Sequence, residues 1–85
     1  MIRFTVTWLP RAEQQLAAIW LSADDRPSIA AAANQIDTEL SVDPQNKGLE
    51  FHEGLREVLI GPLMVLFTVH MQDRIVEVVR IKHLA

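Results

Sequence analysis

The chain has 85 residues, of which 49% are hydrophobic, with a net charge of −3 and no cysteine. This length predicts one domain over residues 1–85 with a small core, and the lack of cysteine excludes disulfides and thiolate chemistry and fits a reducing cytoplasm. The acidic charge argues against broad electrostatic binding of nucleic acid, and no apolar run has the length of a membrane span. We therefore expect a cytoplasmic protein without membrane association.

The first half of the chain predicts one strand followed by two helices. Residues 2–8 alternate apolar and polar side chains, which is the pattern of a half-buried strand. Pro10 can open a helix, since the first helical turn needs no backbone donor, and apolar residues recur at helical spacing as far as Ala23. After an aspartate-containing break, Pro27 opens a second helix with an apolar stripe that ends at Leu40.

The second half predicts three consecutive strands after a polar loop at residues 45–50. The strands are Leu55–Ile60, Leu63–His70 and Ile75–Lys82, separated by Gly61–Pro62 and by the turn Met71–Arg74. The element order is therefore β-α-α-β-β-β. Helices grouped before a run of strands indicate an α+β fold, with a helical hairpin packed on one face of an antiparallel four-stranded sheet.

The connections also predict how the four strands are arranged. Consecutive hairpins make the last three strands neighbours, so the first strand must pair at an edge of this meander. If the chain reverses direction at each step from the first strand through the two helices and the three later strands, the first strand runs antiparallel to the last. We expect the spatial order 1-4-3-2, which places the last strand in a central position.

The two helices can cover only one face of this sheet, and the other face is expected to be open. Alternation along Leu63–His70 directs the set that contains Phe67 to the core and the set that begins at Met64 to the open face. A contiguous exposed apolar patch normally marks a binding surface. The residues expected to contact a partner are Met64, Leu66, Thr68, His70, Val78 and Lys82.

The turn before the last strand determines which face Arg80 and Lys82 occupy. A three-residue loop over Gln72–Arg74 would place both on the open face, whereas a two-residue loop would send them beneath the helices, because one residue of register reverses every side chain. Burial of two charges is costly, so we favour the three-residue loop. The sequence predicts no cofactor and no metal site, since its three histidines lack the paired spacing of metal ligands.

Several segments together resemble a known family. They are PRAEQQLAAIWL, DRPSIAAAANQIDTEL, a following DP, GLREVLIGPLMVLFTV and DRIVEVVRIKH. In this order they resemble the RelE/ParE superfamily of bacterial toxins from type II toxin–antitoxin modules, which are sometimes described as plasmid-stabilisation proteins. The resemblance covers nearly the whole chain and implies the fold predicted above.

The resemblance implies a toxin that a cognate antitoxin neutralises, and it leaves the target open. ParE-like members bind and poison DNA gyrase, which needs no catalytic residues and tolerates acidic charge. RelE-like members cleave mRNA on the ribosome, where they hold the RNA on the open face with Arg and Lys and a C-terminal Tyr or His. We favour target binding over cleavage. A diverged, non-toxic interaction module is a further alternative, and an exposed apolar face also favours a homodimer when the antitoxin is absent.

Compared position by position with the family pattern, the chain matches poorly at the residues that a ribonuclease would need for catalysis. The segment RIKH matches the family's RVGH, so Arg80 and His83 are retained, and Arg56 or Glu57 falls at a usually basic position. The family's strand arginine is replaced by Met64, which cannot stabilise charge that develops on a phosphate. The resemblance therefore implies catalytic roles for Arg80, His83 and Arg56 only if the chain is a RelE-like endoribonuclease.

Overall fold

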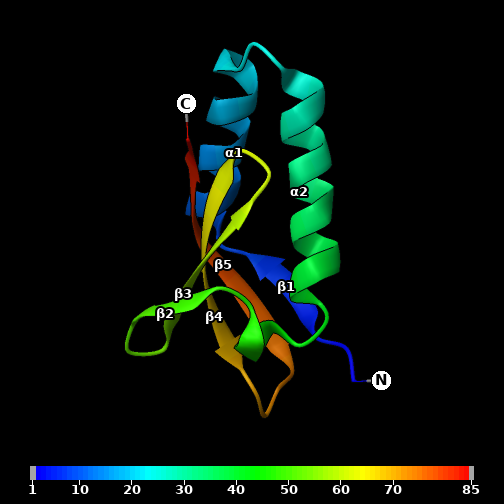
Figure 1. Cartoon of the computed structure of the whole chain (residues 1–85), viewed down its shortest axis with the longest axis vertical. Coiled ribbons are helices and arrows are strands. Elements are labelled where there is room, and N and C mark those ends of the chain that lie inside the picture. Colours follow the sequence, from blue (N-terminus) through cyan, green and yellow to red (C-terminus); the bar gives the residue numbers. More distant parts are fainter. Residues whose placement is uncertain (1, 85) are drawn as a thin grey trace.

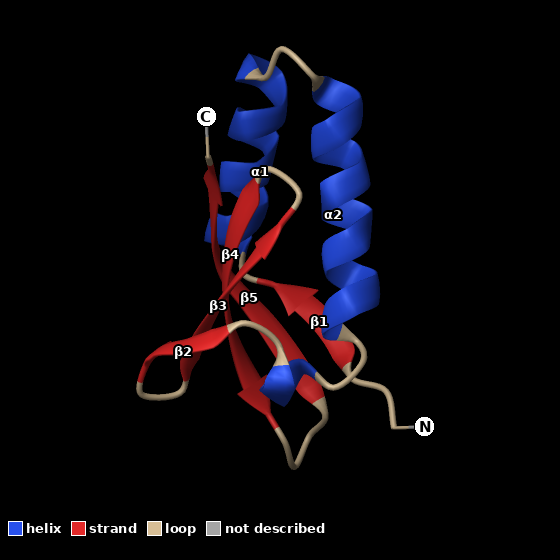
Figure 2. Ribbon diagram, viewed as in Figure 1, coloured by secondary structure: helices blue, strands red, loops and turns tan. Residues whose placement is uncertain are grey.

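The computed structural model describes residues 2–84 and shows a helical hairpin packed on a five-stranded sheet. In chain order the elements are β1 (Thr5–Trp8), α1 (Pro10–Ser22), α2 (Arg26–Leu40), the 3₁₀ helix η1 (Pro44–Asn46), β2 (Leu49–His52), β3 (Leu55–Ile60), β4 (Leu63–His70) and β5 (Ile75–His83) (Figure 1). Met1 and Ala85, the ends of the predicted domain, lie outside the described residues. The predicted α+β fold with a helical hairpin is confirmed, and Figure 2 distinguishes the two helices of the hairpin in blue from the strands in red.

The strands form one mixed sheet in the order β1-β5-β4-β3-β2. The predicted strands correspond to β1, β3, β4 and β5, so the predicted order 1-4-3-2 is correct for them. Two details of the prediction were wrong. A fifth strand, β2, begins inside the expected polar loop and pairs with β3 at the edge of the sheet, and β1 pairs parallel rather than antiparallel with β5.

The parallel pairing follows from the course of α1. This helix leaves the end of β1 and continues toward the same end of the molecule, and only α2 returns (Figure 1). The return ends beside the start of β1, where the backbone N–H of Phe4 donates to the carbonyl of Ser41 at 2.8 Å. The chain therefore reverses direction only between α1 and α2, and not also between β1 and α1 as the prediction assumed. This difference makes β1 parallel to β5.

The edge of β5 is covered first by β1 and then by α1. Strand β1 pairs only with Ile75–Val78, and the N–H of Leu9 extends this pairing with a hydrogen bond of 3.0 Å to the carbonyl of Val78. Beyond that point the Gln15 side chain of α1 accepts a hydrogen bond of 2.8 Å from the N–H of Ile81. A side chain thus satisfies a backbone group that would otherwise need a further strand.

Both helices begin as the sequence predicts. Pro10 and Pro27 stand in their first turns, where a missing N–H costs nothing. The Asp25 carboxylate caps α2 by accepting hydrogen bonds from the Ser28 N–H and hydroxyl at 3.2 and 2.6 Å. Over residues 2–84, no helix combines the length and the hydrophobicity needed to cross a membrane.

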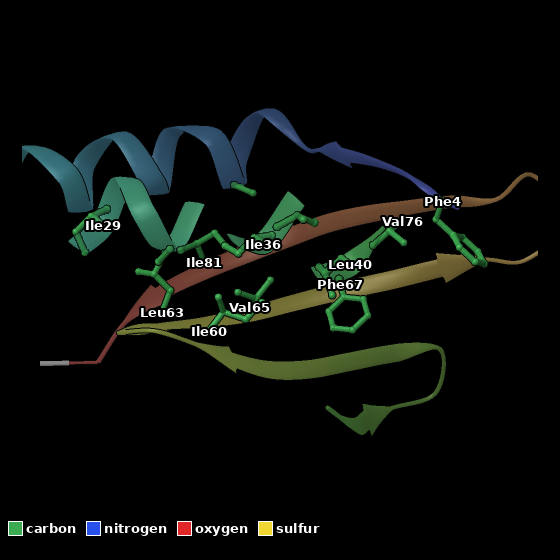
Figure 3. Packing of buried hydrophobic residues seen from close by; sticks show 13 residues of the cluster. Phe4, Ile29, Ile36, Leu40, Ile60, Leu63, Val65, Phe67, Val76 and Ile81 are labelled. Carbon is green, nitrogen blue, oxygen red and sulfur yellow. The ribbon is translucent and has the colours of Figure 1, made fainter. Parts of the chain in front are cut away.

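The core lies between the hairpin and one face of the sheet (Figure 3). The helices contribute Ala12, Ile29, Ala32, Ile36 and Leu40, and the strands contribute Ile60, Leu63, Val65, Phe67, Val76, Val78 and Ile81. Every second residue of β4 from Leu63 to Phe67 is fully buried, as its alternation predicts. Each large side chain of this set stabilises the fold by about 1.5–3 kcal/mol, so the helix-covered face is fixed and the opposite face of the sheet stays uncovered by the helices.

Gly48 allows β2 to approach β3. Substitution of this glycine by alanine is therefore expected to destabilise the fold more than the same substitution at Gly54. Gly48 has φ +63°, and a Cβ there would collide with the carbonyl oxygen of Glu57. Gly54 has φ +77°, but its Cβ would meet no atom within 4 Å. We expect Gly48→Ala to lower the free energy of unfolding by about 3 kcal/mol, and Gly54→Ala by about 1 kcal/mol from backbone strain alone. Urea denaturation measures both values, and equal losses would contradict this account.

Candidate functional site

The open face of the sheet carries a hollow of about 450 Å³. This cavity is the open-face hollow. Its lining residues are Arg11, Phe51, Leu55, Glu57, Met64, Leu66, Val79, Arg80, Lys82 and Leu84. Met64 and Leu66 come from the central strand β4 and are half-buried. The predicted apolar open face is thus a concave surface with an apolar middle.

The turn between β4 and β5 differs from the predicted one. His70 pairs with Ile75, so the connection is the four-residue turn Met71–Arg74 and not a three-residue loop. Arg74 adopts φ +54° in this turn. Continued without interruption, this register would direct Arg80 toward the helices.

A bulge in β5 corrects the register. Between Leu66 and Phe67 the pairing shifts by one residue, and Val79 is the extra residue on β5. Beyond the bulge, Leu66 pairs with Arg80 and Met64 pairs with Lys82. Both cations therefore lie on the open face, as expected, although a bulge places them there instead of the predicted loop.

Three cations flank one side of the open-face hollow. Arg80 and Lys82 come from β5, and Arg11 comes from the first turn of α1. All three are exposed, and Glu57 of β3 is the acidic residue of the lining. The surface is thus amphipathic, with apolar side chains at the centre and a basic flank next to α1.

The apolar side of this surface extends beyond the residues predicted from the sequence. Leu59 pairs with Met64, and Leu49 pairs with Glu57, so both share the open face. Leu49, Phe51 and Leu59 are 78%, 64% and 56% exposed. Sequence reasoning missed β2 because LEFH lies in a polar segment, and the glycines on either side of it were the available turn signal.

Thr68 and His70 occupy the far end of the open face, where the sequence placed them. Thr68 pairs with Glu77, and its hydroxyl lies 3.3 Å from Nε2 of the exposed His70. The prediction that Val78 shares this face was wrong. Val78 pairs with Phe67 before the bulge and is fully buried in the core, because the bulge that turns Arg80 outward comes one residue later.

The structure does not bring Arg56 to the open face. Arg56 pairs with Phe67, which places it on the helix side of the sheet. Its guanidinium donates to the carbonyls of Lys47 and Gly48 at 2.9 and 3.1 Å. Of the two residues considered for the family's basic position, the acid Glu57 is the one on the open face, so Arg56 does not lie beside Arg80.

His83 also lies away from Arg80. It pairs with Leu63, a core residue. It lines a separate hollow of about 480 Å³ with Asp24 and Asp25 from the α1–α2 connection and Ser28 from the first turn of α2. Hydrogen bonds from the Ser28 side chain and backbone hold the pKa of the Asp25 carboxyl below its ordinary value of 3.8. Asp25 is therefore ionised as a helix cap and is unsuited to act as a general acid beside His83. Within residues 2–84, no three His, Asp or Glu side chains gather as a metal site would require.

Comparison with known proteins identifies the family. A model described as the ParE toxin of the type II toxin–antitoxin system, parDE, matches residues 6–85. The chain belongs to the ParE toxin family. A search of curated proteins gives no match.

Solved structures share the fold of this ParE-family chain. The RelBE2 toxin–antitoxin complex from Mycobacterium tuberculosis contains a chain with a TM-score of 0.81 and 20% identity, over 98% of this chain and 93% of that one. A chromosomal ParDE system from P. aeruginosa gives 0.73 and 18%, over 96% and 97%. The archaeal RelE–RelB complex from Pyrococcus horikoshii gives 0.68 and 14%, over 98% and 96%. Identities this low establish a common fold.

The Gln15 hydrogen bond holds the part of β5 that carries Arg80 and Lys82. We expect Gln15→Leu to lower the free energy of unfolding by about 1–2 kcal/mol, because the Ile81 N–H then lacks its acceptor. The same change at the exposed neighbour Gln14 is expected to cost under about 0.5 kcal/mol. Urea denaturation and amide exchange at Ile81 measure these effects. Unchanged exchange at Ile81 in Gln15→Leu would show that the bond does not protect the strand.

Proposed function

We propose that this ParE-family chain is a toxin that acts in the cytoplasm by binding DNA gyrase, and that a cognate antitoxin neutralises it. The observation that carries the proposal is the separation of Arg80 from both Arg56 and His83. The three candidate catalytic residues lie on two faces of one sheet. A toxin with this arrangement is better suited to binding than to cleavage.

RNA cleavage would need an acid–base group and a cation at the same phosphate. A general acid or base must come within hydrogen-bond reach of the proton that it transfers, and the stabilising cation must face the developing charge. Arg80 faces the open-face hollow, whereas His83 lines the hollow at the start of α2. Arg56 is held by two loop carbonyls. Arg80 and His83 therefore line different hollows, and Arg56 lies on the helix side of the sheet.

The open face has the composition of a protein-binding surface. Protein interfaces combine an apolar centre, which excludes water, with a polar rim that sets orientation. Met64 and Leu66 form such a centre, and Arg11, Arg80 and Lys82 form a basic flank. The exposed Phe51 adds an aromatic side chain next to the free edge of β2. A large protein such as gyrase can contact this whole surface without any chemistry.

The same face suits an antitoxin. RelBE2 and the archaeal RelE–RelB structure are toxin–antitoxin complexes, which supports a proteinaceous partner for this chain as well. An amphipathic segment with apolar anchors and acidic neighbours would match the apolar centre and the basic flank. Neutralisation then follows from competition, because antitoxin and target would occupy one surface.

The binding proposal predicts inhibition of gyrase that depends on the centre of the open face. Purified chain should inhibit supercoiling by gyrase, and Met64→Lys should raise the half-inhibitory concentration about thirtyfold, as for the loss of an interface anchor worth about 2 kcal/mol. Ala31→Lys adds the same charge on an exposed helix position away from this face and should leave inhibition unchanged. No inhibition at a large molar excess of folded chain would overturn the gyrase assignment.

A RelE-like endoribonuclease is a second candidate, and one observation favours it. Arg11, Arg80 and Lys82 gather at one hollow and could together hold a phosphate backbone. This candidate predicts ribosome-dependent mRNA cleavage that Arg80→Ala abolishes and Arg56→Ala does not. Absence of cleavage in a translating extract, together with inhibited gyrase, would exclude it.

A further inference from the structure

Strand β2 forms the outer edge of the sheet, where it pairs with β3. All four of its residues are exposed, and Figure 1 shows the strand projecting from the sheet away from the helical hairpin. Two antiparallel strands that lack further packing are only marginally stable in water. The position of β2 therefore depends on attachments at the point where the chain enters it.

The Arg56 side chain of β3 supplies such an attachment. Its Nε donates to the carbonyl of Lys47 at 2.9 Å, and its Nη2 donates to the carbonyl of Gly48 at 3.1 Å. These two residues directly precede β2. A guanidinium is planar and holds its donors in a fixed arrangement, so two simultaneous bonds fix the direction of the bound backbone as well as its distance. Arg56 thereby sets the course of the chain into β2.

Gly48 holds the same segment against β3 by direct contact. Its φ is +63°, and a Cβ there would collide with the carbonyl oxygen of Glu57. The segment of Lys47 and Gly48 is therefore packed against the backbone of β3 while Arg56 binds its carbonyls. Contact and hydrogen bonds together leave it little freedom to shift.

Arg56 acts from the side of the sheet that a partner on the open face does not reach. It pairs with the fully buried Phe67 on the helix side and is itself half-buried. A cation in such a place is tolerated when its donors are used, and two of its donors bind the carbonyls that precede β2. Any effect of Arg56 on binding at the open face must therefore pass through the segment that it holds.

That segment leads into the β2 wall of the open-face hollow. Leu49 shares the open face with its pairing partner Glu57. Phe51 is the extra residue of a bulge between Glu50 and His52, and it lines the hollow. A bulge redirects side chains, and large aromatic residues are frequent anchors of protein interfaces. The direction of Phe51 therefore depends on how the chain enters β2.

We propose that Arg56 is a positioning residue for partner binding, because it holds β2 so that Phe51 forms a wall of the open-face hollow. The inference rests on the proposed function, in which the open face binds the target. It deepens that function by assigning an effect on affinity to a residue that does not touch the target. Arg56 and Phe51 are then one functional unit across two faces of the sheet.

Inhibition of gyrase supercoiling by the full chain, made by cell-free synthesis, tests this coupling. Phe51→Ala should raise the half-inhibitory concentration about thirtyfold, and Arg56→Gln should raise it about tenfold. The double variant should stay near the value of Phe51→Ala, because the position of β2 matters little once the anchor is gone. Independent effects would multiply to about three hundredfold, and that result would overturn the proposal. Circular dichroism confirms that each variant is folded.

Two further variants separate the geometry of the guanidinium from its charge. Arg56→Lys keeps the charge, but one ammonium group does not reproduce the fixed pair of donors, so it should still weaken inhibition about fivefold. Lys47→Gln removes a positive charge from the same segment and keeps the carbonyl that Arg56 binds, so inhibition should not change. Full activity of Arg56→Lys would assign the effect to charge and would contradict a positioning role.

Backbone order parameters from nitrogen-15 relaxation test the inference without any target. In Arg56→Gln, the values for residues 49–52 should fall below about 0.6, while those for residues 63–67 of β4 stay near 0.85. Unchanged values at β2 would overturn the proposal, and so would an equal fall in both strands, which would mean a general loss of order. If the natural sequence fails to inhibit gyrase, the gyrase assignment fails, and the selective loss of order at β2 decides the role of Arg56.

Discussion

Strand β5 is held on one side by β4 and on the other by β1 and helix α1. This anchoring determines which side chains of β5 the toxin exposes on its open face. Backbone pairing with β1 holds the first half of β5, and the Gln15 side chain holds the second half at Ile81. Between them the extra residue Val79 shifts the register, so Ile81 enters the core while Arg80 stays outside. A bulge that reorients side chains next to a functional surface is a recurring device of sheets. Without it, Arg80 would point into the helix layer and the open face would lose part of its basic flank.

The alternation of side chains along the strands was sufficient to predict the main features of the site. The local backbone geometry, by contrast, could not be predicted from the sequence. The buried and half-buried residues of β4 could be assigned correctly because a two-residue period leaves no freedom once one face is covered. The bulge at Val79 carries no signal, since valine is typical of a regular strand and no glycine marks the site. Arg11 was missed because its place beside the hollow depends on how α1 crosses β5, which no local pattern encodes. The separation of Arg80 from His83 could have been foreseen, since residues three apart on a continuous strand face opposite sides.

The chain has retained the family's fold while its candidate catalytic residues are distributed over two faces. The uncovered face is apolar at its centre and basic at its side. This surface is suited to protein partners, since it offers anchors that water would otherwise cover. Within the ParE toxin family, this arrangement is consistent with toxicity by association, in which a target and an antitoxin compete for one face.

Growth of a bacterial host after induced expression of the chain tests this account most directly. The natural sequence, the double variant Arg80→Ala with His83→Ala, and the single variant Met64→Lys should be compared at matched levels of folded protein. Toxicity by binding predicts arrest by the natural sequence and by the double variant, and relief of arrest by Met64→Lys. Full rescue by the double variant, with arrest retained in Met64→Lys, would show that the chain acts as a catalyst and would contradict the account.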